Sequence, residues 1–177
     1  MKWFIKCFKQ YVDFNSRARR KEYWFFALFN FIISLVLMCL WIGPVFVEAV
    51  SAELNGTEMD EGNIVQKLLY NPALYIWILY YLATIIPSIA VTVRRLHDIG
   101  KSGLWAFLIY GGSFLSLFTD MPNQSAAAKA VISLVEVGIL ILSLIWMFTD
   151  SQSGENQWGP NPKENPTPEE MTPNDLI

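Results

Sequence analysis

Long, largely apolar runs alternate with short polar stretches along the chain. The apolar runs cover residues 23–47, 72–93, 104–118 and 126–148. About 20 apolar residues in helical form span the ~30 Å hydrocarbon core of a bilayer. The pattern therefore predicts an all-α fold, with a transmembrane domain of four spanning helices over residues 23–149. The run over residues 104–118 is short for a spanning helix.

Two details concern the second run. Asn71 precedes Pro72, which is the arrangement of an N-cap residue followed by proline at the first helical position. Pro87 lies inside the run and removes the hydrogen bond to the carbonyl of Ala83. The sequence thus predicts a helix that begins at Pro72.

Composition agrees with a membrane protein. Hydrophobic residues make up 53% of the 177 residues, and charged residues only 16%. Soluble domains contain about 25% charged residues. The mean hydropathy is +0.32.

An amphipathic pattern occupies residues 2–12. One side carries Trp3, Phe4, Cys7, Phe8 and Tyr11, and the other carries Lys2, Lys6, Lys9 and Gln10. We expect a helix in the membrane interface with its lysines toward anionic headgroups. The alternative is an ordinary amphipathic helix packed on the protein. This helix and the basic block that follows form a predicted cytoplasmic segment over residues 1–22.

The distribution of cations predicts the orientation. Seven lysines and arginines precede the first run, three lie between the second and third, one follows the fourth, and only Lys67 and Lys129 lie elsewhere. The stretch over residues 48–67 is acidic and is expected to be an outer loop. Because cytoplasmic loops are enriched in cations, both termini and the stretch after the second span are predicted to be cytoplasmic.

The central polar stretch, residues 94–105, is expected to be a loop and the centre of a cytoplasmic cap. The cap would join residues 17–24, 94–105 and 156–162. Since Asp98 is one acid among many cations, we expect it to pair with Arg17, Arg19, Arg20, Arg94 or Arg95. The candidate residues for binding an anion or partner are Arg17, Arg19, Arg20, Glu22, Arg94, Arg95, His97, Asp98, Gly100, Lys101, Ser102, Gly103, Asn156, Gly159 and Pro160.

No enzymatic motif stands out. The residues Gly100-Lys101-Ser102 resemble the end of a phosphate-binding loop, but Arg95 occupies the position of that motif's first glycine. Amides around Gly100 and Gly103, together with Arg94, Arg95 and Lys101, could still hold an anion such as a lipid phosphate. His97 and Asp98 are adjacent, which rarely gives the geometry of a base and its orienting acid. We therefore expect no enzyme, no cofactor and no metal site, and we interpret Cys7 and Cys39 as free thiols.

Glu136 is an acid well inside an apolar run. It shares a helical face with Lys129, Ser133 and Ser143. A polar stripe in a spanning helix usually faces a bundle interior, a partner or a water path. Two interpretations stay open, namely a transport pathway and an acid that connects helices. Ser133, Glu136 and Ser143 are the candidate intramembrane polar residues.

Three motifs together resemble the bacterial inner-membrane family called domain of unknown function 805. They are Arg-Ala-Arg-Arg-Lys-Glu-Tyr-Trp at residues 17–24, Arg-Arg-Leu-His-Asp-Ile-Gly-Lys-Ser-Gly-Leu at residues 94–104, and Asn-Gln-Trp-Gly-Pro-Asn-Pro at residues 156–162. The resemblance implies a small multi-pass protein of the bacterial inner membrane. It implies no activity.

These observations give two functional hypotheses. The first is a non-enzymatic membrane protein that binds a partner protein or anionic lipid through the cytoplasmic cap, with no nucleic-acid partner. The second is an oligomeric channel or proton-coupled transporter that uses the Glu136 stripe. The tail over residues 150–177 is rich in proline and asparagine and is expected to be disordered, except near residues 154–162.

Overall fold

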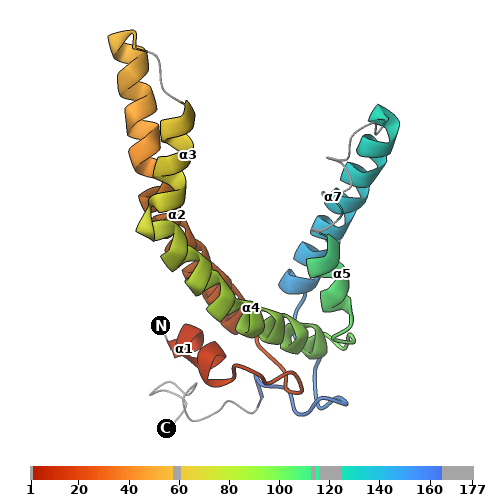
Figure 1. Cartoon of the computed structure of the whole chain (residues 1–177). Coiled ribbons are helices and arrows are strands. Elements are labelled where there is room, and N and C mark those ends of the chain that lie inside the picture. The colour runs from red at the N-terminus through yellow and green to blue at the C-terminus, as the bar shows by residue number, and fades with distance from the viewer. Residues whose placement is uncertain (1, 58–60, 113–114, 116–124, 165–177) are drawn as a thin grey trace. The chain divides into compact units, whose positions relative to one another are not determined.

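The structure, a computed structural model, describes residues 2–57, 61–112, 115 and 125–164. The helices are α1 (Lys2–Lys9), α2 (Arg20–Asn55), α3 (Glu61–Tyr70), α4 (Pro72–Asp98), α5 (Trp105–Gly112) and α7 (Ala126–Phe148). They are shown in Figure 1. The described residues contain no strand, only an isolated bridge between Asn156 and Gly159. The predicted all-α class is confirmed.

Within the described residues, three helices are long and apolar enough to cross a membrane: α2, α4 and α7. They correspond to the first, second and fourth predicted spans. The third run forms α5, whose 8 residues extend only about 12 Å along a helix axis. Most of the rest of that run, residues 113–114 and 116–118, lies outside the described residues. A fourth span therefore stays a prediction.

Two predicted boundaries are wrong. The acidic stretch over residues 48–67 is not one loop, because α2 continues to Asn55 and α3 begins at Glu61. Good helix formers in this stretch favour the helical form, and an ion pair between Glu48 and Lys67 joins α2 to α3. The helix α4 also continues past residue 93 to Asp98. The predicted loop over residues 94–105 is therefore helical in its first part.

The chain forms two compact units, residues 1–26 with 87–177 and residues 27–86, and both α2 and α4 contribute to each. In the second unit, polar and aromatic side chains join α2 to α4. Trp77 donates to Ser34 Oγ at 3.2 Å, and Tyr80 donates to Asn30 Oδ1 at 2.5 Å. Trp41 stacks on Trp77 with ring centroids 5.6 Å apart. Such contacts connect helices where the hydrophobic effect provides no driving force.

Asn71 has two roles in the second unit. Its Oδ1 accepts the Ala73 amide at 2.9 Å, which confirms the predicted cap of α4. Its Nδ2 donates to the carbonyls of Leu40 and Trp41 at 3.1 and 3.0 Å. Pro44 lies four residues after Leu40 and has no amide hydrogen to donate. Asn71 therefore supplies the donor that Pro44 removes from α2.

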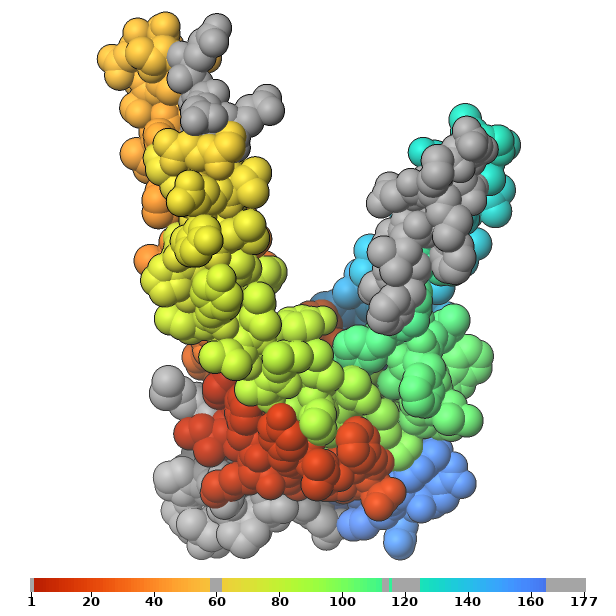
Figure 2. Space-filling view, in the orientation of Figure 1, coloured from red at the N-terminus to blue at the C-terminus, as the bar shows by residue number. Residues whose placement is uncertain are grey.

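In the first unit, α1 packs on the protein through its apolar side. Cys7 is buried with Ala18, Phe26 and Val91, and the ring of Phe4 lies 5.6 Å from that of Phe26. Figure 2 shows the red N-terminal residues against the yellow-green end of α4. These contacts agree with the alternative of a helix packed on the protein. Ile5 and Val12 remain exposed, and an interfacial position stays a prediction.

The helices α5 and α7 lie side by side in the first unit (Figure 1). A Cβ placed on Gly112 would come within 3.2 Å of Ile139, so the absence of a side chain allows the close approach. Leu96, Ala106, Trp146 and Met147 form a buried cluster where α4, α5 and α7 meet. Three helices are thereby joined next to the polar residues that end α4.

The role of Asn71 predicts a non-additive pair of substitutions. Asn71→Ala removes a cap and the donor to the Leu40 carbonyl, and should lower the free energy of unfolding by about 1–2 kcal/mol. With Pro44→Ala, residue 44 can donate to Leu40 itself, so Asn71→Ala should cost less in that background. Thermal unfolding of the four proteins in detergent measures this. An equal cost in both backgrounds would show that Asn71 does not compensate for Pro44.

Candidate functional site

The polar residues that end α4 are fully buried. Arg94, Arg95 and Asp98 are each 0% exposed and lie within its last five residues. Gly100 ends the helix with a φ of +74°. The Gly100 amide donates to the His97 carbonyl and the Lys101 amide to the Leu96 carbonyl. This pair of hydrogen bonds is a Schellman motif, which needs a left-handed residue that glycine adopts without strain.

Asp98 lies between two arginines. Its Oδ1 accepts Arg17 Nε at 3.2 Å, and its Oδ2 accepts Arg95 Nη1 at 2.5 Å and Ser151 Oγ at 2.6 Å. The predicted pairing of Asp98 with an arginine is confirmed, and two of the five candidates share it. The carboxylate joins residues from the N-terminal segment, α4 and the C-terminal segment.

Arg17 connects the N-terminal segment to the C-terminal segment. Its guanidinium donates to the carbonyls of Gln152 at 2.6 Å, Gly154 at 2.8 Å and Gly159 at 3.1 Å. Its side chain is 1% exposed. Because arginine has five donors in a fixed plane, one side chain can bind several carbonyls and a carboxylate. This binding holds residues 152–159 against the end of α4.

A second buried acid, Glu22, occupies the first turn of α2. Its carboxylate accepts a hydrogen bond from Arg94 Nη1 at 2.7 Å and forms an ion pair with Lys6 Nζ at 2.9 Å. Arg94 also donates to Gln10. Cys7 Sγ lies 3.8 Å from Glu22 Oε1. Burial, and then the negative charge of Glu22, raise the pKa of the Cys7 thiol to about 12, so this thiol stays protonated near neutral pH.

The turn before Arg17 has its own hydrogen bonds. Asp13 accepts the amides of Asn15 and Ser16 and the Ser16 hydroxyl. Burial alone would raise the pKa of Asp13, but these hydrogen bonds lower it below its ordinary value. The Ala18 amide then donates to the Arg94 carbonyl at 3.1 Å. Arg17 is therefore placed by backbone contacts on both of its sides.

Three donors bind the carboxyl end of α7. Arg95 donates to the carbonyls of Met147 and Thr149, Arg20 to that of Phe148 at 3.3 Å, and Trp24 to that of Met147 at 3.3 Å. The last carbonyls of a helix lack partners within it and carry its negative pole. Two arginines here supply both hydrogen bonds and opposite charge. From here on, we use the name cap for residues 2–24, 94–104 and 146–164, a larger set than the cytoplasmic cap predicted from sequence.

The glycines of the α4–α5 connection have packing roles. A Cβ on Gly103 would lie 2.6 Å from Val93 Cγ1, and one on Gly100 would lie 2.7 Å from Gln152 Oε1. Ser102 Oγ accepts the Leu104 amide at 3.3 Å. The Gly100 and Lys101 amides are bonded within the Schellman motif. At the anion site proposed from sequence, the Gly100 and Lys101 amides and the nearby arginines therefore already bind other groups of the protein.

The other candidate cap residues lie around this centre. The ring of His97 stacks on Trp158 at 4.3 Å, and Asn156 Nδ2 donates to the His97 carbonyl at 3.0 Å. Arg19 donates to the Pro162 carbonyl. Lys101 lies over the Trp146 ring at 5.1 Å, and Pro160 is exposed.

Arg20 and Lys163 pair with Asp150 on the outside of the cap. A hydrogen bond from Lys163, more than the nearby positive charges, lowers the pKa of Asp150. Asp150 is more than half exposed. This cluster is the surface counterpart of the buried Asp98 pairs.

The predicted disorder of the tail is wrong for residues 150–153, because Ser151 and Gln152 bond to Asp98. Residues 165–177 lie outside the described residues. Sequence reasoning also missed Cys7, Gln10, Ser151 and Gln152 as cap residues. Small polar residues near arginines are common, and no spacing distinguishes these four.

The intramembrane polar residues are only partly brought together. Glu136 and Ser143 line one cavity of about 450 Å³ with Ile109, Gly112, Val137, Ile139 and Leu140. Glu136 Oε1 is buried and has no hydrogen-bond partner. Ser143 donates to the Leu140 carbonyl at 2.8 Å. Ser133 and Lys129 are exposed and are not among the described residues that line this cavity.

Spanning-length helices joined to a buried ionic cap define the class of a membrane protein with transmembrane helices. The relatives described next are named as inner membrane proteins. The family model described as "Protein of unknown function (DUF805)" matches residues 11–160. The chain belongs to this family. The match covers the first two motifs that gave the resemblance in the sequence and residues 156–160 of the third.

Two curated relatives from Escherichia coli (strain K12) are similar over nearly their whole length. "Inner membrane protein YhaI" is 31% identical over 92% of this chain and 97% of the relative, and "Inner membrane protein YhaH" is 32% identical over 94% and 100%. "Uncharacterized protein YiiR" is 40% identical over 41% of this chain and 51% of its own. No solved structure matches the chain.

The burial of Asp98 predicts a large cost for its removal. Asp98→Ala leaves Arg17 and Arg95 without a carboxylate, and should lower the free energy of unfolding by about 3–5 kcal/mol. The matched control is Asp150→Ala, which removes an exposed acid with two cationic partners and should cost about 0–1 kcal/mol. Thermal unfolding in detergent compares them. Equal melting of Asp98→Ala and the parent would contradict a folded cap.

Proposed function

We propose that the protein is a non-enzymatic, multi-pass inner-membrane protein that binds anionic lipid through the cap. The proposal includes a cytoplasmic cap, cytoplasmic termini and a fourth span that includes α5. His97 and Asp98 have no catalytic role in it, because the His97 ring stacks on Trp158 and the Asp98 carboxylate binds Arg17, Arg95 and Ser151. The cap is then a rigid platform rather than a reactive site.

The observation that carries the proposal is the contrast between three buried and three exposed cations of the cap. Arg17, Arg94 and Arg95 are buried with internal partners. Lys2, Lys9 and Lys21 are exposed, as are the apolar side chains of Ile5 and Val12. Exposed lysines beside exposed apolar side chains are typical of a segment at the surface of an anionic membrane. The buried arginines support α1 in this position.

The test changes the exposed lysines together. Replacement of Lys2, Lys9 and Lys21 by Gln should weaken binding of phosphatidylglycerol by up to about a hundredfold, since each lysine near an anionic surface contributes ~1 kcal/mol. Replacement of the same three by Arg keeps the charge and is the matched control. Native mass spectrometry with phosphatidylglycerol and phosphatidylcholine of the same chains measures binding.

Two outcomes would count against lipid binding by these lysines. The first is equal binding of both lipids by the parent. The second is the same affinity for phosphatidylglycerol in the Gln and Arg variants. A protein that co-purifies in stoichiometric amount, and is lost in the Gln variant alone, would replace anionic lipid by a partner protein as the ligand of the cap.

The proposed orientation predicts a labelling pattern. It rests on the uneven distribution of cations along the chain. In a background with Cys7→Ala and Cys39→Ser, Ser51→Cys should react with an impermeant thiol reagent added to intact cells, and Ser153→Cys should react only after lysis. Both positions are exposed. The reverse pattern would place the cap outside.

A second candidate function is proton-coupled transport through the Glu136 cavity. The specific observation is the buried Glu136 Oε1, which has no partner beside a cavity of about 450 Å³. An acid in this environment is a common proton carrier in membrane proteins. Proteoliposomes of the parent should then show a proton flux that Glu136→Gln abolishes and Ser133→Ala leaves unchanged. No flux above empty liposomes in the parent excludes this function.

A further inference from the structure

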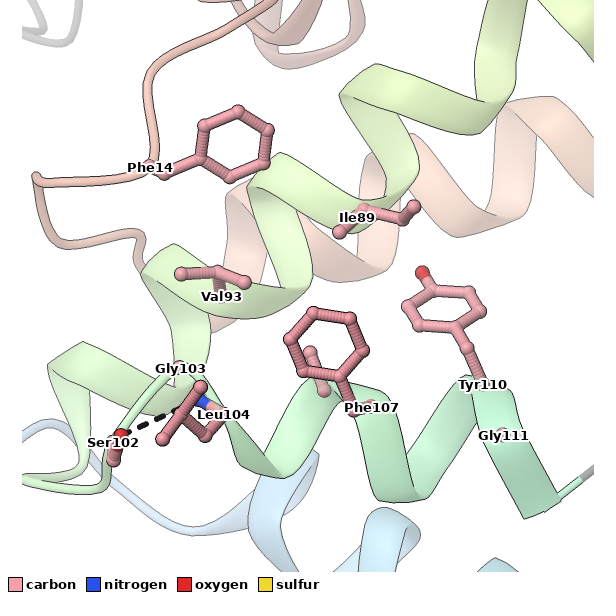
Figure 3. A pocket seen from close by; sticks show the side chains of 10 residues that line it. Phe14, Ile89, Val93, Ser102, Gly103, Leu104, Phe107, Tyr110 and Gly111 are labelled. Carbon is pink, nitrogen blue, oxygen red and sulfur yellow. Dashed lines mark hydrogen bonds between the residues drawn. The ribbon is translucent and has the colours of Figure 1, made fainter.

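An apolar groove of the first unit lies between α4 and α5. Its volume is about 470 Å³. Ile89 and Val93 project into it from α4, and Phe107 and Tyr110 project from α5 (Figure 3). Phe14 contributes its ring from the segment between α1 and α2 (Figure 3). The residues that complete the lining are Ser102, Gly103, Leu104, Ala106 and Gly111.

The polar groups of the groove already have partners. Tyr110 Oη donates to the Ser88 carbonyl at 3.0 Å and lies 2.9 Å from Thr92 Oγ1. Ser102 Oγ accepts the Leu104 amide (Figure 3). None of the described lining residues carries a charge. A ligand of this groove therefore needs apolar surface and needs no hydrogen-bonding group.

The surroundings of the groove indicate where the ligand comes from. Its outer edge carries Leu104 and Phe107, which are 71% and 77% exposed. Such exposure of large apolar side chains is typical of a surface that faces lipid tails. One end of the groove lies at Ser102 and Gly103, which belong to the cap, and the opposite end lies at Tyr110 and Gly111 (Figure 3). The groove thus runs from the polar cap into the apolar part of the protein, as a phospholipid runs from headgroup to chain.

We propose that this groove binds one acyl chain of a bilayer phospholipid. The acyl chain lies between α4 and α5, and the lipid headgroup lies beyond Ser102. Recognition depends on the acyl chain of the lipid, because the described lining residues offer no group that could recognise a headgroup. The site is therefore independent of the lysines that the proposed function assigns to anionic headgroups.

Gly111 offers a substitution that fills the groove. It lines the groove, and a Cβ placed on it meets no atom within 4 Å. Gly111→Leu should fold, since leucine favours a helix over glycine. Gly138→Leu is the matched control, because Gly138 is a helical residue of α7 with equally open space and does not line this groove.

The experiment uses the full chain in vesicles that contain phosphatidylcholine with a photoactivatable diazirine near the end of one chain. After irradiation, mass spectrometry maps the adducts. We expect an excess of adducts on residues 104–111 over the exposed faces of α2 and α7. Gly111→Leu should reduce that excess by about tenfold or more, and Gly138→Leu should leave it unchanged.

Three results would overturn the proposal. They are an even distribution of adducts over all exposed helix faces, the same adducts in Gly111→Leu as in the parent, and a higher yield with the matched free fatty acid than with the phospholipid. Phosphatidylglycerol with the same chain should give a similar yield at residues 104–111. Such an equal yield would support recognition by the acyl chain and would leave the lysine site to be decided by the Gln and Arg variants of Lys2, Lys9 and Lys21.

Discussion

The structure depends on how two carboxylates are shared among buried cations. Glu22 and Asp98 are fully buried, and each binds two cationic side chains. A buried charge is tolerated only when it is paired and its remaining donors are bonded. Arg17 bonds to backbone carbonyls of the C-terminal segment and Arg95 to carbonyls at the end of α7, while Arg95 Nε is buried without a hydrogen-bond partner. Segments distant in sequence must therefore assemble together, because any missing segment leaves a buried charge without a partner.

The ends and interruptions of the spanning helices follow the same requirement. The carbonyls at the end of α7 bind arginines and a tryptophan, and the carbonyl that Pro44 leaves free in α2 binds Asn71. In hydrocarbon a polar group without a hydrogen-bond partner costs several kcal/mol. This is roughly the cost of removing one partner from a buried ion pair. The protein thus uses long polar side chains where a soluble protein would use water.

Much of the fold could be predicted from sequence, because hydrophobic runs and the Asn71-Pro72 cap are local patterns. The pairing of Asp98 with an arginine was also predictable, since a lone acid among cations has few alternatives. The choice of Arg17 and Arg95 was not, because it depends on the extra turn of α4 that buries residues 94–98. The carbonyl partners of Arg17 belong to residues 152–159 and could not be inferred from residue types. The sequence also suggested an anion site at Gly100, because residue types alone do not show that the Schellman motif uses the Gly100 and Lys101 amides.

The sequence separations within the cap have a consequence for biogenesis. Arg17 binds Asp98 across 81 residues and Gly154 across 137 residues. During synthesis from the N-terminus, the segment that carries Arg17 therefore emerges long before its last partners do. Long-range closure of this kind is a late step of folding. Until residues 147–159 have been made, Arg17 and Arg95 lack their carbonyl partners, so a chain that stops or stalls in the last span exposes them. Closure of the cap thereby distinguishes a finished chain from an unfinished one.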